Sequence, residues 1–179
     1  MAIVDVRIDD RLIHGQVCSY WIPYHSVDRI VIVDDGIAHD EMRKTALRFG
    51  CPGECKLSIF TAEKAATKLA ARLDRGINVM VLCATPQPLV DMADEGFAVQ
   101  QVTVGNMSTK PCARQIRKTV FVSPQEVRAF SELASRGIRI YDQMIPNAQR
   151  EDITALFQPG GEGLKFEQDE MRNKGVNDG

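Results

Sequence analysis

The chain has 179 residues, of which 44% are hydrophobic and 26% charged, a composition typical of one globular domain rather than of a disordered or fibrous chain. Its net charge of −2 repels polyanions overall, so we expect no nucleic-acid partner. The longest purely apolar run covers only residues 79–84, whereas a membrane-spanning helix needs about 20 residues. These features argue against a nucleic-acid-binding protein and against a membrane-spanning one.

The cysteines and histidines predict no metal site. The five cysteines contain no CxxC pair, and the three histidines show no HxxxH spacing. Cys51 and Cys55 flank a Pro-Gly sequence, which we interpret as an ordinary turn. Because the amino terminus has no basic segment followed by a long apolar one, we expect no export signal, a cytoplasmic location and reduced thiols.

Short β-rich segments alternate with longer amphipathic segments along the chain. The segments predicted as strands are residues 3–8, 29–33, 56–60, 78–83, 99–104, 119–122 and 138–141. Several are continuously apolar, as expected for parallel strands covered by helices on both faces. The pattern predicts an α/β fold with a single doubly wound, mostly parallel sheet of about seven strands and helices on both faces.

Helices are predicted between these strands, at residues 12–21, 40–49, 61–72, 88–94 and 124–136. The last of them has the clearest start, because Ser123 is followed three residues later by Glu126, the spacing of a capping box. We expect residues 1–157 to form the domain. Residues 158–179 are polar and begin with a cluster of helix breakers, so we expect a tail that is mobile or forms one short helix.

The loop after the first strand is the strongest site candidate. Ligands of open α/β sheets bind beyond the carboxyl ends of the strands, and this loop contains His14. Neutral imidazole is a nucleophile near physiological pH and can accept a phosphoryl group. Arg11 or Arg7 can donate guanidinium hydrogen bonds to the phosphoryl oxygens. The arginines supply the neutralising charge, so we expect no magnesium and no other cofactor.

The residues around His14 add backbone donors and carboxylates. Gly15 and Gln16 offer N–H groups where a helix begins, and Gly15 lets the backbone approach a phosphate without an intervening Cβ. Asp9 or Asp10 can hold the imidazole or an arginine, and the residues alone do not decide between them.

Two further strand ends carry candidate phosphate-binding residues. Thr85 follows the predicted strand at residues 78–83, and its hydroxyl can hydrogen-bond to a phosphate or orient the imidazole. Gly105 follows the predicted strand at residues 99–104 and permits close backbone approach. Both residue types are also common in ordinary turns.

The sequence of residues 7–17, RIDDRLIHGQV, followed by Trp21, resembles the active-site signature of the enzyme IIB component of the mannose/fructose/sorbose family of the sugar phosphotransferase system. Further similarities are IVDD at residues 32–35, VGNM at 104–107 and MIP at 144–146. The resemblance covers about residues 2–156. One departure is Thr103, where the family commonly has Asn.

This resemblance implies a phosphoryl-transfer relay. His14 would accept the phosphoryl group from a phosphohistidine of a IIA protein and pass it to a sugar taken up through membrane IIC and IID components. The implied catalytic residues are His14, Arg11 and Asp10: Arg11 would clamp the phosphoryl oxygens, while Asp10 and Arg7 would shape the loop. The protein would be cytoplasmic and peripherally associated with the inner face of the membrane. The sugar and the oligomeric state stay open.

Transfer between proteins requires an exposed, shallow loop, and Trp21, Tyr24, His25 and Met107 are the candidate rim residues. Two other functions are compatible with the same residues. One is a catalytically weak regulatory paralogue that acts through protein binding. The other is an unrelated α/β enzyme in which His14 is a general base.

Overall fold

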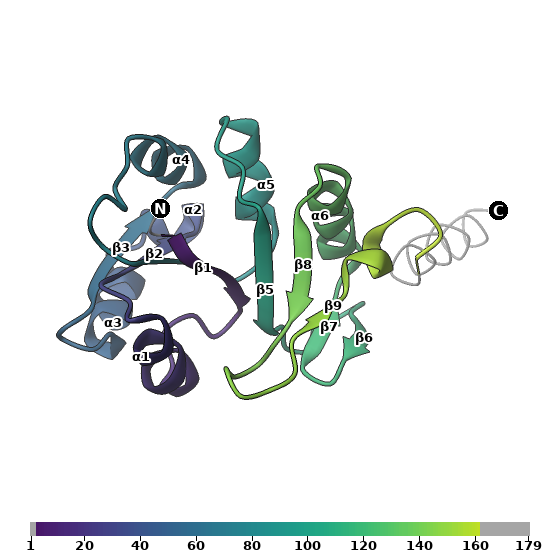
Figure 1. Ribbon diagram of the computed structural model, residues 1–179, viewed down its shortest axis with the longest axis horizontal. Helices are drawn as coiled ribbons and strands as arrows, with labels where there is room; N and C mark the ends of the chain where they lie inside the picture. Colours follow the sequence, from purple (N-terminus) through teal and green to yellow (C-terminus); the bar gives the residue numbers. More distant parts are fainter. Residues whose placement is uncertain (1–2, 162–179) are drawn as a thin grey trace.

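The computed structural model describes residues 3–161, which form a seven-stranded sheet with the order β3-β2-β4-β1-β5-β8-β9 (Figure 1). Every pair of neighbours is parallel except β8 and β9. This sheet confirms the predicted α/β fold. Its strands are β1 (Ile3–Asp9), β2 (Arg29–Val33), β3 (Lys56–Phe60), β4 (Val79–Cys83), β5 (Gln101–Asn106), β8 (Arg139–Asp142) and β9 (Glu151–Asp152).

Helices cover both faces of the sheet. One face is covered by α4 (Ala62–Ala70), α5 (Gln87–Asp94) and α6 (Pro124–Ser135). The opposite face is covered by η1 (Val17–Trp21), α1 (Ile22–His25), α2 (Asp35–Ala38) and α3 (Glu41–Gly50). The connections after β1 and β2 therefore lie on one face and those after β3 and β4 on the other, which is the doubly wound arrangement.

The helix starts follow from the capping residues in the sequence. Ser123 Oγ accepts a hydrogen bond from the Glu126 N–H, and Glu126 Oε2 accepts one from the Ser123 N–H, at 3.4 and 2.8 Å. This reciprocal pair is the predicted capping box of α6. Asp40 and Thr61 cap α3 and α4 with a single hydrogen bond each, in which the side-chain oxygen accepts from the N–H of the third residue on.

Two predictions about strands need correction. The predicted strand at residues 119–122 is β7 (Val120–Val122), and it pairs with β6 (Arg114–Arg117) in a separate antiparallel hairpin instead of joining the main sheet. The seventh strand of the sheet is β9, whose two residues are too few to show a hydrophobic period. Most of the predicted tail, beyond residue 161, lies outside the described residues.

The helix predicted at residues 12–21 begins and ends later in the structure, where helical turns cover residues 15–25. Leu12 has a φ of 55°, its side chain is buried, and its N–H donates to the Asp9 carbonyl at 2.9 Å. After this turn come the helical turns of residues 15–25, which include η1 and α1. We call residues 15–25 the first helix. A left-handed conformation is rare for leucine, so the residue pattern gave no indication of it.

The two faces of β1 carry different chemistry. Val6 and Ile8 belong to the hydrophobic core beneath α4, α5 and α6. On the other face Asp5, Arg7 and Asp9 alternate beneath the first helix, and Arg7 and Asp9 have no exposed surface. We call these three residues the charged column of β1. Buried charges of this kind are costly unless they are paired or hydrogen-bonded.

The guanidinium of Arg7 packs between three parts of the chain. Its Cζ lies 4.3 Å from the centre of the Trp21 ring, and its Nη2 donates to the carbonyls of Gln143 and Met144 at 3.1 and 2.9 Å. Gly105 is skipped in the register between β1 and β5, which passes from Val104 to Asn106. A Cβ on Gly105 would lie 1.9 Å from Arg7 Nη2. Glycine is therefore needed here to make room for the arginine.

We predict that Gly105→Ala lowers the free energy of unfolding by about 1–3 kcal/mol, the usual cost of an overpacked core site. The guanidinium has no free space to retreat into, because it is held by two backbone carbonyls and covered by an indole ring. Chemical denaturation measures the effect. Gly53→Ala is the matched control, since its new Cβ would meet nothing within 4 Å. Equal stability of the two variants would contradict this packing role.

Candidate active site

His14 lies between the turn at Leu12 and the start of the first helix, with 16% of its side chain exposed. Its Nδ1 is 2.8 Å from the Leu12 carbonyl oxygen. Because a carbonyl oxygen only accepts, this contact assigns the ring proton to Nδ1. The lone pair is then on Nε2, which is buried without a hydrogen-bond partner and lies 3.6 Å from Asp9 Oδ2.

Arg11 is held beside this histidine by the same carboxylate. Its Nε and Nη2 donate to Asp9 Oδ1 and Oδ2 at 2.9 and 3.0 Å, a bidentate pair. Nη2 also donates to Gln16 Oε1 at 3.0 Å. Asp9, fully buried, thus faces both Arg11 and His14. The structure decides in favour of Asp9 where the sequence left Asp9 and Asp10 as alternatives.

Hydrogen-bond donors remain available at the surface of the loop. Arg11 keeps 34% of its side chain exposed, and among the described residues its Nη1 has no partner. Gly15 is exposed, and a Cβ there would meet nothing within 4 Å. The first N–H groups of a helix have no intrahelical acceptor and attract anions. The guanidinium and the helix start therefore form an open, electropositive rim beside His14.

Asp10 fastens the loop to the end of β5 and does not point to the imidazole. Its Oδ1 accepts from Asn106 Nδ2 at 2.8 Å and its Oδ2 from the Ser108 N–H at 2.6 Å. Burial would raise the pKa of Asp10, but the hydrogen bonds from Ser108 and Asn106 outweigh it and hold the pKa below its ordinary value. Asp10 is therefore a positioning residue in this geometry, which fixes the loop, and not a catalytic residue that touches the reacting groups.

Three other residues expected to bind phosphate have different surroundings in the structure. Arg7 is buried beneath the loop and is hydrogen-bonded to backbone carbonyls. Gly105 makes room for Arg7 and so is not free for backbone approach to a phosphate. Thr85 lines a groove of about 600 Å³ with Lys110 and Ser123, next to α5 and α6 and thus on the face opposite the first helix.

At its first residue, Asp5, the charged column of β1 lies next to His25 of α1. The pKa of the Asp5 carboxyl is raised by burial, and burial likewise lowers the pKa of Arg7. Arg7, His25 and the Thr103 side chain act in the opposite direction on the pKa of Asp5, so the residue that departs from the family pattern lies beside this carboxyl. His25 Nε2 lies 4.0 Å from Asp5 Oδ2, and burial lowers the pKa of His25.

The expectation that Trp21, Tyr24, His25 and Met107 form the exposed rim of the loop is only partly correct. Trp21 is buried and donates from Nε1 to the Met144 carbonyl at 3.1 Å, and Met107 has no exposed surface. Tyr24 is exposed, and His25 is partly exposed and stacks on the Trp21 ring. Trp21 is thus a core residue that connects the first helix to the segment after β8.

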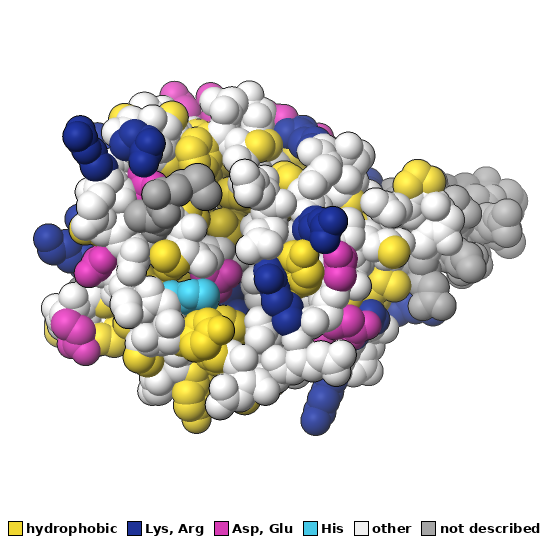
Figure 2. Space-filling model, viewed as in Figure 1, with side chains coloured by type: hydrophobic (Ala, Val, Ile, Leu, Met, Phe, Trp, Pro, Cys, Tyr) yellow, Lys and Arg dark blue, Asp and Glu magenta, His cyan; other side chains and the backbone are white. Residues whose placement is uncertain are grey.

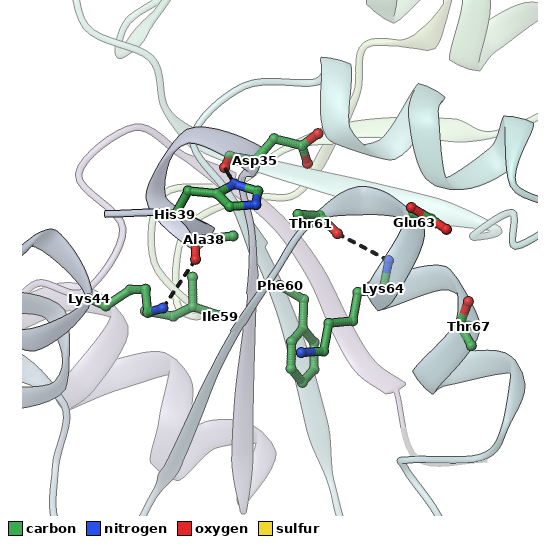
Figure 3. A pocket seen from close by; sticks show the side chains of 10 residues that line it. All are labelled: Asp35, Ala38, His39, Lys44, Ile59, Phe60, Thr61, Glu63, Lys64 and Thr67. Carbon is green, nitrogen blue, oxygen red and sulfur yellow. Dashed lines mark hydrogen bonds between the residues drawn. The ribbon is translucent and has the colours of Figure 1, made fainter. Parts of the chain in front are cut away.

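A larger groove of about 710 Å³ lies at the β3 edge of the sheet, where Figure 3 shows its lining. Its polar groups are largely satisfied within it. Lys44 donates to the Ala38 carbonyl, the Thr61 hydroxyl accepts from the Lys64 N–H, and the Lys64 ammonium lies over the Phe60 ring. The groove also contains no element of the His14 loop. Volume alone therefore does not identify the site in this fold.

Comparison with known proteins tests the resemblance. The family described as the sorbose subfamily IIB component of the phosphotransferase system (PTS) matches residues 3–169. The chain is 36% identical to the fructose-specific EIIB component of Bacillus subtilis strain 168, covering 88% of this chain and 97% of that protein. It is 34% identical to the sorbose-specific EIIB component of Klebsiella pneumoniae, covering 78% and 85% of the two chains.

Solved structures agree with this match. The crystal structure of the IIBSor domain of the sorbose permease from Klebsiella pneumoniae superposes with a TM-score of 0.78 at 31% identity, covering 86% of this chain and 94% of that one. No helix among the described residues is long and apolar enough to cross a membrane. The family resemblance first seen in the His14 loop is therefore confirmed over most of the chain. This protein belongs to the sorbose subfamily of IIB components of the sugar phosphotransferase system, components that are sugar phosphotransferases.

Proposed function

We propose that this protein is a phosphoryl-transfer relay in which His14 accepts a phosphoryl group from a phosphohistidine of a IIA protein and passes it to a sugar. The observation that carries the proposal is the pairing of one nucleophile with one fixed guanidinium at the carboxyl edge of the sheet. Asp9 Oδ2 lies 3.6 Å from His14 Nε2, and the Asp9 carboxylate accepts two hydrogen bonds from the Arg11 guanidinium, at 2.9 and 3.0 Å.

Each transfer is an in-line displacement at phosphorus, between two nitrogens in the first step and from the His14 nitrogen to a sugar hydroxyl oxygen, which loses its proton, in the second. A new N–P bond to His14 forms as the N–P bond to the donor histidine breaks, and negative charge concentrates on the phosphoryl oxygens. Positioned cationic and N–H donors stabilise that charge. The free Nη1 of Arg11 and the backbone N–H groups of Gly15 and Gln16 supply them here.

The His14 ring must turn before it can react. One nitrogen is bonded to the Leu12 carbonyl and the other is buried against Asp9. In-line attack requires a lone pair that points at the incoming phosphorus, which neither contact allows. Both ring nitrogens are therefore blocked in the resting loop, and rotation of the ring toward Arg11 and solvent exposes a lone pair for attack. A modest number of cationic contacts suits a relay, because an over-stabilised phosphohistidine would not release its phosphoryl group.

The other loop residues act indirectly. Gln16 orients Arg11, Asp10 ties the loop to β5, and Arg7 supports it from below. The partners in this proposal are the IIA donor, the membrane IIC and IID components and the sugar. Transfer to a translocated sugar brings the protein to the inner face of the membrane as a peripheral component.

The direct test is labelling by a phosphorylated IIA protein. We expect an acid-labile, alkali-stable phosphoryl label on the wild-type protein and none on His14→Ala, because phosphohistidine has this lability, the phosphoesters of serine, threonine and tyrosine do not, and only one imidazole lies in the loop. His25→Ala and His39→Ala are the matched controls and should keep the label. Label that survives His14→Ala would overturn the proposal.

We expect Arg11→Ala to slow transfer to His14 by more than about tenfold. The variant also leaves the buried Asp9 carboxylate without its bidentate partner, so circular dichroism checks that it is folded before the rates are compared. Stopped-flow or quench-flow transfer from the phosphorylated donor measures the rate. Arg11→Lys keeps the charge but not the bidentate geometry, so it should recover only part of the rate. A wild-type rate for Arg11→Ala would remove this residue from the mechanism.

A further inference from the structure

Exposed hydrophobic side chains are concentrated on one face of the protein. Among the described residues, the large hydrophobic side chains that are exposed are Tyr20, Tyr24, Met42 and Phe49, with 53%, 63%, 83% and 88% of their surface accessible. The first helix carries the two tyrosines, and α3 carries the other two residues. Figure 2 shows hydrophobic side chains gathered over the position of α1. Exposed apolar surface concentrated on one face in this way marks an interaction site.

Both helices are in direct contact with the His14 loop. The first helix begins at Gly15, immediately after His14. At the end of α3, a Cβ on Gly50 would lie 3.2 Å from Ile13 Cγ2, so the loop packs directly on the last turn of this helix. The Cys18 thiol donates to the Gly50 carbonyl at 3.6 Å, which links the two helices. Their exposed surfaces therefore flank the phosphoacceptor.

The charged side chains of α3 add net positive charge to this surface. None of the residues of α3 is buried. Lys44 pairs with Glu41 at 2.5 Å, whereas the exposed Arg43 and Arg48 add two positive charges to the same helix. An apolar surface edged by arginines is complementary to an apolar surface edged by carboxylates.

We propose that Tyr20, Tyr24, Met42 and Phe49, edged by Arg43 and Arg48, form the docking surface for the phosphodonor protein. We call these six residues the two-helix face. The inference rests on the proposed function, because a donor phosphohistidine can reach His14 only if its protein covers the surface around the loop. A transient complex needs less than about 1,200 Å² of buried surface in total, and large side chains at its centre dominate the affinity.

The test separates docking from chemistry. The rate of phosphoryl transfer is measured against the concentration of the phosphorylated IIA protein of the same transport system. The Met42→Ser/Phe49→Ser double variant should raise KM about tenfold or more, because two exposed contact side chains are lost. The rate at saturating donor should stay within about twofold of the wild type, since no loop residue changes.

A charge reversal provides the matched control. Arg48→Glu should raise KM and weaken its dependence on salt, because it replaces an attractive charge by a repulsive one. Lys68→Glu makes the same change on an exposed position of α4, on the opposite face of the sheet, and should leave KM unchanged.

Three outcomes overturn the inference. The first is an unchanged KM in both the double variant and Arg48→Glu. The second is a fall in the saturated rate at unchanged KM, which would mean that α3 acts through the loop and not by docking. The third is normal labelling by the donor with a defect only in transfer to the sugar, which would assign the face to the acceptor. Absence of label on the wild-type protein would instead refute the proposed function itself.

Discussion

The buried carboxylate of Asp9 is the interaction on which the site depends. It lies at the end of β1 with no exposed surface and faces three groups that carry or can carry positive charge. Arg7 Nε is 3.9 Å away, Arg11 chelates it, and His14 Nε2 is 3.6 Å away. A buried carboxylate is costly without partners, so its burial and the arrangement of these three side chains require each other. One carboxylate thus fixes the group that neutralises the phosphoryl charge beside the nucleophile.

The rest of the fold serves this arrangement. Arg7 can lie beneath the loop because Gly105 has no side chain, and Trp21 and the Met144 carbonyl enclose it. Asp10 closes the other side of the loop by binding Asn106 and the Ser108 N–H. Segments far apart in the sequence therefore converge on one turn, which explains why similarity to the family recurs near residues 104–107 and 144–146.

The sequence predicted the sheet and most helices because hydrophobic periodicity and capping residues are local signals. It also proposed His14 and Arg11 as site residues, and in the structure both side chains face Asp9. It did not choose between Asp9 and Asp10, because that choice depends on the register in which Asp9 pairs with Asn106. The alternation of charges at Asp5 and Arg7 was the available signal, since strand residues two apart share a face. The left-handed Leu12 and the packing of Gly105 against Arg7 arise only in three dimensions.

The central claim is that Asp9 holds Arg11 beside His14, in the position from which the guanidinium assists transfer. The most direct measurement is the rate of phosphoryl transfer to the Asp9→Asn variant at saturating phosphorylated donor, with its fold checked by circular dichroism. The account predicts a fold like that of the wild type and a rate reduced by about tenfold or more, because a small misplacement of reacting groups is expensive. A folded Asp9→Asn protein that accepts the phosphoryl group at the wild-type rate would contradict the account.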